Sequence, residues 1–221
     1  MIVGKRMQSQ PVTLMQNQSL LDASKTMKKT NVRHIPVVNE NRQLVGIITD
    51  NDVKKASASD ATTLDIHELL YLLDNIKVED VMIKKVIVVP PDLPLEEAAK
   101  ILHDNKFGCL PVVKDQELVG IITISDVLEF LMEAMAVQSD STRVELELDD
   151  QPGALANVLD SIRDHGYSLC AIIASPERIG NKVTVTLRMA CDNDYELRKT
   201  LEDDGYRIVS FTHHSNASTE E

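Results

Sequence analysis

The sequence contains no tryptophan and few other aromatic residues: aromatics make up 3% of its 221 residues, whereas hydrophobic residues make up 43%. Its cores must therefore be aliphatic, and the hydrophobic fraction suffices for one to three small domains. No apolar run approaches the roughly 18 to 20 residues that a membrane span requires. Residues 1–6 lack the apolar stretch and cleavage site of a signal peptide, so we expect a cytoplasmic protein with no membrane partner.

The sequence also has only three cysteines, and its basic residues are outnumbered by its acidic ones. Cys109, Cys170 and Cys191 lie in apolar runs without metal-ligand spacing, which favours small buried hydrophobes in a reducing compartment over a disulfide framework. The formal net charge is −12, and nucleic-acid binding depends on clustered Lys and Arg that neutralise phosphates. We therefore expect no nucleic-acid partner. The cations concentrate in the first quarter of the chain, where they either form solvated helix faces or serve a phosphorylated metabolite.

What the chain does contain is an internal duplication. Residues 7–56 and 82–131 share the pattern of an apolar residue followed by Pro-Val-Val, then Leu-Val-Gly-Ile-Ile-Thr and Asp-Val. The two copies stay in register apart from one deleted residue. A repeat of this length indicates two copies of one supersecondary unit, neither of which closes its core alone.

Each copy has the same expected order of elements. A short extended run (11–14; 86–89) precedes a helix whose apolar residues recur every three or four positions. Two strands of buried β-branched residues follow as a hairpin (35–38 with 45–49; 110–113 with 117–123). A second helix then begins near Thr49 or Thr123, since hydroxyl and carboxylate groups suit a helix N-terminus. Between the copies, residues 64–76 predict an amphipathic helix, which either covers an exposed face or makes an oligomer contact.

From Arg143 onward the pattern changes. Residues 143–148 alternate apolar with charged side chains, as a half-exposed strand does, and a helix with an apolar stripe follows up to Gly166. Strands at 169–174 and 183–189, a helix at 195–201 and a strand at 206–211 complete the order βαββαβ, a ferredoxin-like arrangement. His213, His214 and residues 215–221 are expected to be disordered, and two adjacent histidines without a third ligand make a weak metal site.

Thr49 with Asp52, and Thr123 with Asp126, suggest a nucleotide site. Each pair lies where a strand passes into a helix N-terminus, so backbone N–H groups and the helix dipole favour an anion there. A carboxylate one turn away can accept two hydrogen bonds from a ribose diol. The alternative is helix capping, for which Thr and Asp are preferred residues. Duplication does not decide between the two, because inheritance preserves caps as well as sites.

These residues carry a family resemblance. Residues 7–56 and 78–131, with the lead-in at 77–82, resemble a tandem pair of cystathionine-beta-synthase (CBS) domains, the Bateman module. The tail, with its Asp-Gln-Pro-Gly-Ala-Leu turn, resembles an ACT domain. The expected fold class is thus mixed α/β and α+β, a CBS pair followed by a ferredoxin-like domain. The order CBS, CBS, ACT is similar to that of bacterial acetoin utilization proteins, which implies a place in acetoin or acetate metabolism.

The CBS resemblance implies a regulatory module whose clefts bind adenosine-containing ligands such as AMP, ADP, ATP, S-adenosylmethionine or NAD. The positions it assigns to ribose, phosphate and base are Asp52, Asp126, Thr49, Thr123, Ile35 and Leu110. The first repeat departs from the family pattern, since Arg33 stands where the second repeat has Gly108. Arg33 either grips a phosphate or fills the cleft, and in the second case one site is empty.

The ACT resemblance implies side-by-side pairing in a homodimer and an amino acid bound at the shared edge. The residues of this turn and the following helix are Asp150, Gln151, Pro152, Gly153, Leu155 and Asn157. Gly153 allows a ligand to approach the backbone, and the helix N-terminus can take a carboxylate. The turn could equally serve only to dock one domain on another, since an unpaired strand edge favours either kind of pairing.

Catalysis is not expected. The sequence shows no nucleophile with a plausible base, no metal-ligand cluster and no phosphate-binding glycine loop. We expect a CBS domain with its connecting helix at 1–76, a second CBS domain at 77–136, an ACT domain at 142–213 and a disordered tail at 214–221. The predicted function is a non-catalytic regulator that senses an adenine nucleotide and acts on an unidentified protein. The alternative is an oligomerising adaptor that binds a protein partner without a small ligand.

Overall fold

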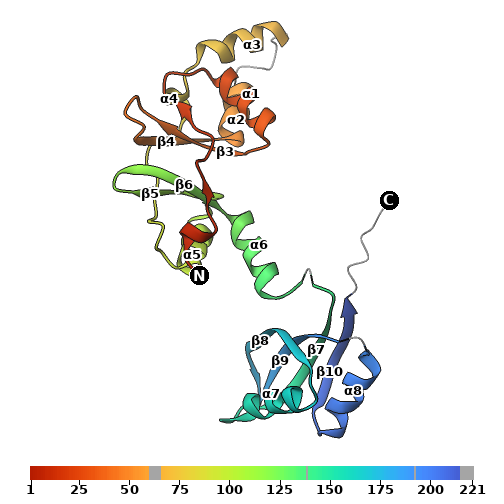
Figure 1. The fold of residues 1–221 in the computed structure, drawn as a ribbon. Coiled ribbons are helices and arrows are strands. Elements are labelled where there is room, and N and C mark those ends of the chain that lie inside the picture. Colours follow the sequence, from red (N-terminus) through yellow and green to blue (C-terminus); the bar gives the residue numbers. More distant parts are fainter. Residues whose placement is uncertain (60–65, 138, 192, 215–221) are drawn as a thin grey trace. The chain divides into compact units, whose positions relative to one another are not determined.

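The computed structural model describes residues 1–59, 66–137, 139–191 and 193–214. The chain divides into two compact units, Met1–Leu128 and Glu129–Glu221, and each is considered by itself. Figure 1 shows that both units contain helices and strands. No helix in the described ranges is long and apolar enough to cross a membrane.

The first repeat forms a three-stranded sheet in the order β2-β3-β4 with two helices. Its elements are η1 (Val3–Lys5), β1 (Gln8–Ser9), β2 (Leu14–Met15), α1 (Leu20–Thr30), β3 (His34–Val38), β4 (Leu44–Thr49) and α2 (Asp50–Ser59). The predicted hairpin is confirmed as the antiparallel pair β3 and β4. Of the extended run predicted at 11–14, only Leu14 pairs with β3: the parallel strand β2 consists of Leu14 and Met15. The Ser19 hydroxyl caps α1 by accepting a hydrogen bond from Asp22 N–H at 3.1 Å.

The second repeat has the same plan. Its elements are α4 (Val78–Val81), α5 (Leu95–Asn105), β5 (Cys109–Lys114), β6 (Glu117–Thr123) and α6 (Ile124–Ala134). The hairpin of β5 and β6 is confirmed, whereas the run predicted at 86–89 contributes a single bridge between Val89 and Val112. The predicted connecting helix is observed as α3 (Ile66–Asn75), and Leu64 and Asp65 lie outside the described residues.

The two repeats exchange their leading segments. β1, at the start of the first repeat, pairs with β6 of the second, with Gln8 opposite Ile121. Reciprocally, Ile83, at the start of the second repeat, exchanges two backbone hydrogen bonds of 2.9 and 3.0 Å with Ile47 on β4 of the first. Glycine permits both crossings: a Cβ at Gly46 or Gly120 would lie 2.5 or 2.4 Å from the sulfur of Met82 or Met7. The exchange therefore binds the repeats into one unit.

The core of this unit follows the predicted stripes. Leu20, Ala23 and Met27 of α1 are buried, and their counterparts on α5 are buried too: Leu95, Ala98 and Leu102. Between the repeats, Ile47, Cys109 and Ile121 form a small buried cluster. Burial raises the pKa of the Cys109 thiol to about 12, so this thiol acts as an apolar side chain.

The second unit has the predicted βαββαβ order. Its elements are β7 (Ser141–Asp149), α7 (Ala154–Asp164), β8 (Ser168–Ile179), β9 (Lys182–Ala190), α8 (Asp194–Asp203) and β10 (Arg207–His214), and its antiparallel sheet has the order β10-β7-β9-β8. β8 and β10 are therefore the edge strands (Figure 1). Val144, Leu146 and Leu187 on the strands pack with Val158 of α7 and Leu197 of α8.

Two expectations for this unit are corrected. β8 does not end at residue 174 but continues through Pro176 to Ile179, because a register shift between Ala174 and Arg178 accommodates the proline. His213 and His214, expected to be disordered, are the last residues of β10 and pair with Thr142 and Ser141. A bulge at Val209 interrupts the pairing register of β10. The sequence of residues 207–214 therefore lacks a regular two-residue pattern from which the end of the strand could be predicted.

Candidate functional site

The starts of α2 and α6 carry the predicted Thr and Asp pairs. Thr49 donates from its backbone N–H and its hydroxyl to Oδ2 of Asp52, at 3.0 and 2.6 Å, and its hydroxyl accepts from Asp52 N–H at 3.2 Å. Thr123 and Asp126 repeat this geometry at 2.7, 2.7 and 3.2 Å. Both pairs are thus helix caps. Within the described residues Oδ1 of each carboxylate has no hydrogen-bond partner, so capping leaves one oxygen for a ligand hydroxyl.

A first cleft of about 330 Å³ lies beside the start of α2. Both repeats line it: Arg33, His34, Ile47, Thr49, Asp50 and Asn51 come from the first, and Ile83, Lys85, Val86, Ile87, Lys106, Phe107, Gly108 and Cys109 from the second. Its volume lies in the range of small-molecule sites, which are mostly apolar with a few placed polar groups. Phe107 and the isoleucines provide apolar walls for a planar base.

The first cleft also carries positive charge. Arg33, Lys85 and Lys106 line it, and the side chains of these three residues form no ion pair or hydrogen bond with any other residue in the described ranges. The nearby carboxylate of Asp50 is engaged by Lys54 at 2.5 Å. An apolar wall beside unpaired cations and a helix N-terminus suits a ligand with a flat apolar part and a phosphate.

A second cleft of about 520 Å³ lies beside the start of α6 and is the counterpart of the first in the duplicated unit. Its lining is more polar: Gln8, Asn31, Val32, Arg33, His34, Gly108, Ile121, Thr123, Ile124 and Ser125. Arg33 is its one arginine, and no lysine lines it among the residues that are described. The two clefts therefore differ in charge although their caps are alike.

The structure separates the predicted site residues into three groups. Thr49, Thr123 and Arg33 line the clefts, and Asp52 and Asp126 are not among the lining residues but hydrogen-bond to the threonines as their capping partners. Ile35 and Leu110, by contrast, are 0% exposed in the core and line neither cleft. Successive side chains on a strand point to opposite faces, so the neighbours His34 and Cys109 face the first cleft instead.

Sequence reasoning missed several lining residues. Ile83, Val86 and Ile87 reach the first cleft because the leading segment of the second repeat crosses onto β4. Gln8 reaches the second cleft by the equivalent crossing of β1 onto β6. Because side chains on a strand point alternately to its two faces, the positions next to the buried Ile35 and Leu110 were a signal that could have identified His34 and Cys109.

His34 separates the two clefts. Its ring packs against Gly108, where a Cβ would lie 2.3 Å from Nε2, and both residues line both clefts. Burial lowers the pKa of His34, and the charge of Arg33 lowers it further against the opposing effect of Asp52. The imidazole ring between the two clefts is therefore uncharged near neutral pH.

The predicted turn of the second unit borders a polar cavity of about 480 Å³. Gly153 has a φ of +89°, which explains the glycine at the start of α7. Gln151 and Asn157 line the cavity together with Lys182 and Arg207. These cations are already paired, Lys182 with Asp149 at 2.7 Å and Arg207 with Glu147 at 2.8 Å.

The other predicted residues of this turn lie outside the cavity lining. Asp150, Pro152, Gly153 and Leu155 are exposed. Asp150 accepts a hydrogen bond of 2.6 Å from Nε of Arg178 on β8, which ties the turn to the edge strand.

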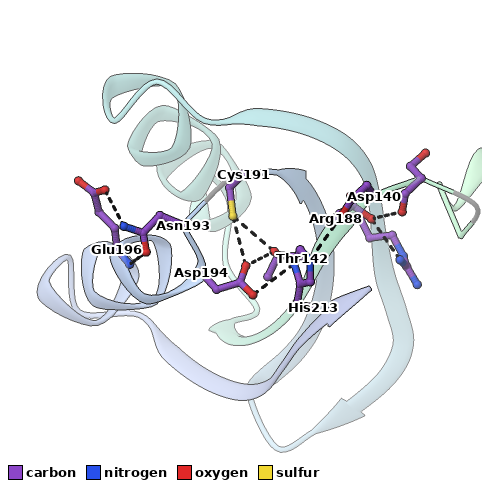
Figure 2. Close-up of polar contacts among 10 residues, drawn as sticks. Asp140, Thr142, Arg188, Cys191, Asn193, Asp194, Glu196 and His213 are labelled. Carbon is purple, nitrogen blue, oxygen red and sulfur yellow. Dashed lines mark hydrogen bonds and ion pairs between the residues drawn. The ribbon is translucent and has the colours of Figure 1, made fainter. Parts of the chain in front are cut away.

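Figure 2 shows a second polar cluster, where β7, α8 and β10 meet. The Thr142 hydroxyl lies 3.2 Å from Nδ1 of His213 and donates a hydrogen bond to Asp194. The Cys191 thiol donates to Asp194 at 3.4 Å, and burial raises its pKa, with Asp194 adding to the effect against Thr142. A thiol held protonated is a poor nucleophile. No group of three or more metal-ligating side chains suited to a metal ion occurs in the described part of the chain.

Comparison with known families places the repeats. Residues 3–59 and 78–133, together just over half of the chain, match the family model of the CBS domain. The uncharacterized protein MJ1426 of Methanocaldococcus jannaschii is 32% identical over 151 residues, which are 58% of this chain and 90% of that protein. Inosine-5′-monophosphate dehydrogenase of Staphylococcus saprophyticus is 37% identical over 129 residues, and the match spans 23% of that enzyme.

Solved structures agree with this placement. A protein assigned as an acetoin utilization protein (AcuB) of Vibrio cholerae has a TM-score of 0.54 at 33% identity and matches 62% of this chain and 96% of its own. The CBS domain pair of protein MJ0100, in complex with 5′-methylthioadenosine and S-adenosyl-L-methionine, has a TM-score of 0.50 at 31% identity over 59% and 99%. CBSX2 in complex with AMP has a TM-score of 0.50 at 28% identity over 59% and 96%.

Proposed function

The chain belongs to the CBS-domain family, and from that premise we propose that it is a non-catalytic regulatory protein that senses an adenine nucleotide in its CBS pair. The first cleft carries the proposal, because it combines an apolar wall, a helix N-terminus and three cations that form no ion pair with another described residue. The CBS pairs of CBSX2 and protein MJ0100 are similar to this chain and bind AMP and S-adenosyl-L-methionine, respectively, so an adenosine-containing ligand fits the family.

The proposal assigns a role to each group at the first cleft. Oδ1 of Asp52 accepts hydrogen bonds from the ribose, while Oδ2 remains the cap of α2. The α2 N-terminus and Arg33 take the phosphate, and Phe107 with Ile87 holds the base. Sensing then requires that the nucleotide bind one arrangement of the protein better than another.

The second unit is proposed to be an ACT domain, at 142–213, that pairs through the β8 edge in a homodimer. Exposed apolar side chains on both faces of β8 support pairing there: Leu169, Ile172 and Ile173 are 37% to 38% exposed. A long, apolar, unpaired edge strand favours association with another strand. An amino acid near the turn at residues 150–153 belongs to the same proposal, as does the AcuB-like role in acetoin metabolism in the cytoplasm.

Thermal unfolding of the full chain tests nucleotide sensing. AMP, ADP, ATP, S-adenosylmethionine and NADH are each added at 100 times the dissociation constant or to solubility. A bound ligand then contributes about 2.7 kcal/mol and raises the midpoint by about 5 to 10 °C. The shift should vanish in Asp52→Ala/Asp126→Ala and persist in Asp160→Ala, a control at an exposed position on α7. If no compound shifts the midpoint, the oligomerising adaptor becomes the better account.

Sedimentation velocity tests the pairing edge. Ile173→Lys places a charge on β8 and should convert the dimer to a monomer, whereas Val209→Lys places the same charge on the opposite edge, β10, and should not. Val209 is 55% exposed, so the control change needs no repacking. A dimer unaffected by Ile173→Lys would argue against pairing through β8.

A further inference from the structure

Arg33, His34 and Gly108 line both clefts and form the boundary between them, which we call the axis. The two repeats carry different residue types at this axis. Arg33 and Gly108 occupy equivalent positions in the duplicated pattern, and each lines both clefts. A symmetric pair would have two arginines here, one from each repeat. Among the described residues that line the two clefts, Arg33 supplies the one guanidinium.

Within the described ranges, no other cation that lines both clefts replaces the missing arginine. Lys85 and Lys106 line only the first cleft. The ring of His34 occupies the space that a side chain at position 108 would need, since a Cβ there would lie 2.3 Å from Nε2. Because burial lowers the pKa of His34, the ring provides no second positive charge at neutral pH.

The lining of the second cleft suits a ligand without phosphate. Gln8, Asn31 and Ser125 offer neutral donors and acceptors, and the cap of Thr123 and Asp126 repeats the ribose-binding geometry of the first cleft. A phosphate in this cleft would lose its hydration without a dedicated cation, which costs free energy. In the first cleft Lys85 and Lys106 offset that cost.

We propose that the two clefts share Arg33 as their single phosphate-binding arginine, so that the chain takes one phosphorylated adenosine ligand, in the first cleft, and an adenosine ligand without phosphate in the second. The inference rests on the proposed function. Once a phosphate in the first cleft engages Arg33, a second phosphate finds no partner, whereas a neutral nucleoside is not opposed. Two phosphorylated ligands are therefore negatively coupled, and the coupling is reciprocal.

Isothermal titration calorimetry on the full chain tests the sharing. AMP should bind once per chain, and adenosine should still bind to the AMP-saturated protein, whereas further AMP should not. Arg33→Ala should weaken AMP binding by about 10- to 100-fold, as expected for a lost hydrogen bond to a charged group, and leave adenosine binding within about twofold. Lys29→Ala removes an exposed charge on α1 of the same repeat and should change neither ligand.

The outcomes separate the inference from the proposed function. Two AMP molecules per chain of similar affinity, or equal weakening of AMP and adenosine by Arg33→Ala, would overturn the sharing of Arg33 and leave nucleotide sensing intact. Failure of both AMP and adenosine to bind the unmodified chain would overturn the proposed function and the inference with it. Circular dichroism should show that Arg33→Ala is folded, since Arg33 is exposed.

Discussion

The first and second repeats bury equivalent side chains almost equally, yet they differ where they meet. Leu20 and Ile35 are 0% exposed, and their counterparts Leu95 and Leu110 are 1% and 0% exposed. At the axis, by contrast, the first repeat has Arg33 and His34 where the second repeat has Gly108 and Cys109. Duplication has kept the core, on which both folds depend, while the lining of the clefts has diverged. This difference in lining is the basis for proposing that the two clefts bind different ligands.

The largest expected effect concerns what the repeats share. Ile35→Ala and Leu110→Ala should each lower the free energy of unfolding by about 2 to 5 kcal/mol, because each leaves a cavity in a closed core. Urea unfolding followed by circular dichroism measures both. A cost below about 1 kcal/mol for either one would mean that the repeats are not equivalent in their cores.

A smaller effect concerns the axis. Gly108→Ala should lower stability by about 1 to 3 kcal/mol, because the new Cβ must push the His34 ring out of its place. His34→Ala/Gly108→Ala should recover part of this loss, since the ring is gone. A double-mutant cycle by urea unfolding measures the coupling. Additive costs would show that the two residues do not share the space.

The caps provide a matched pair. Thr49→Val and Thr123→Val should each cost about 1 kcal/mol, within the range for lost helix caps, because both hydroxyls make the same hydrogen bonds. Differential scanning calorimetry compares them. Nucleotide-dependent stabilisation should fall for Thr49→Val alone, and a fall for Thr123→Val alone would reverse the assignment of the clefts.

The smallest effect is one of pH. The folded-state pKa of His34 lies below its ordinary value of 6.5, so the unfolded chain binds more protons and the free energy of unfolding falls as pH drops through 6.5 toward the folded value. His34→Gln should flatten this fall between about pH 7 and 5. His103→Gln, on the exposed end of α5, is the control and should leave the fall unchanged. If the slope of the free energy of unfolding against pH is also unchanged in His34→Gln, His34 is not the cause of the fall.

Local patterns predicted most elements of the fold. The stripes of α1 and α5, the hairpins of the repeats and the βαββαβ order are set by residues close in sequence, so spacing reveals them. The exchange of leading segments was not predicted. β1 pairs with a strand more than 110 residues away, and nothing in residues 7–9 specifies that partner. Long-range pairing depends on the whole fold rather than on local propensity.

The candidate site was predicted in part for the same reason. Thr49 and Thr123 follow from helix-start chemistry, and the structure places both in cleft linings. Ile35 and Leu110 are buried in the core, whereas their neighbours His34 and Cys109 line the first cleft, because a shift of one residue on a strand moves a side chain to the other face. The apolar wall at 83–87 depends on the exchange, so it could not be predicted before that pairing was known.

The central claim is that a nucleotide occupies the first cleft in preference to the second. Equilibrium dialysis of labelled AMP against Asp52→Asn and Asp126→Asn tests it directly, because the two changes are matched and each keeps the shape of its cap. We predict that Asp52→Asn weakens AMP binding by about 10- to 100-fold, as expected when a hydrogen bond to a charged group is lost, and that Asp126→Asn changes it by less than about twofold. Equal weakening in both variants, or weakening in Asp126→Asn alone, would contradict this account.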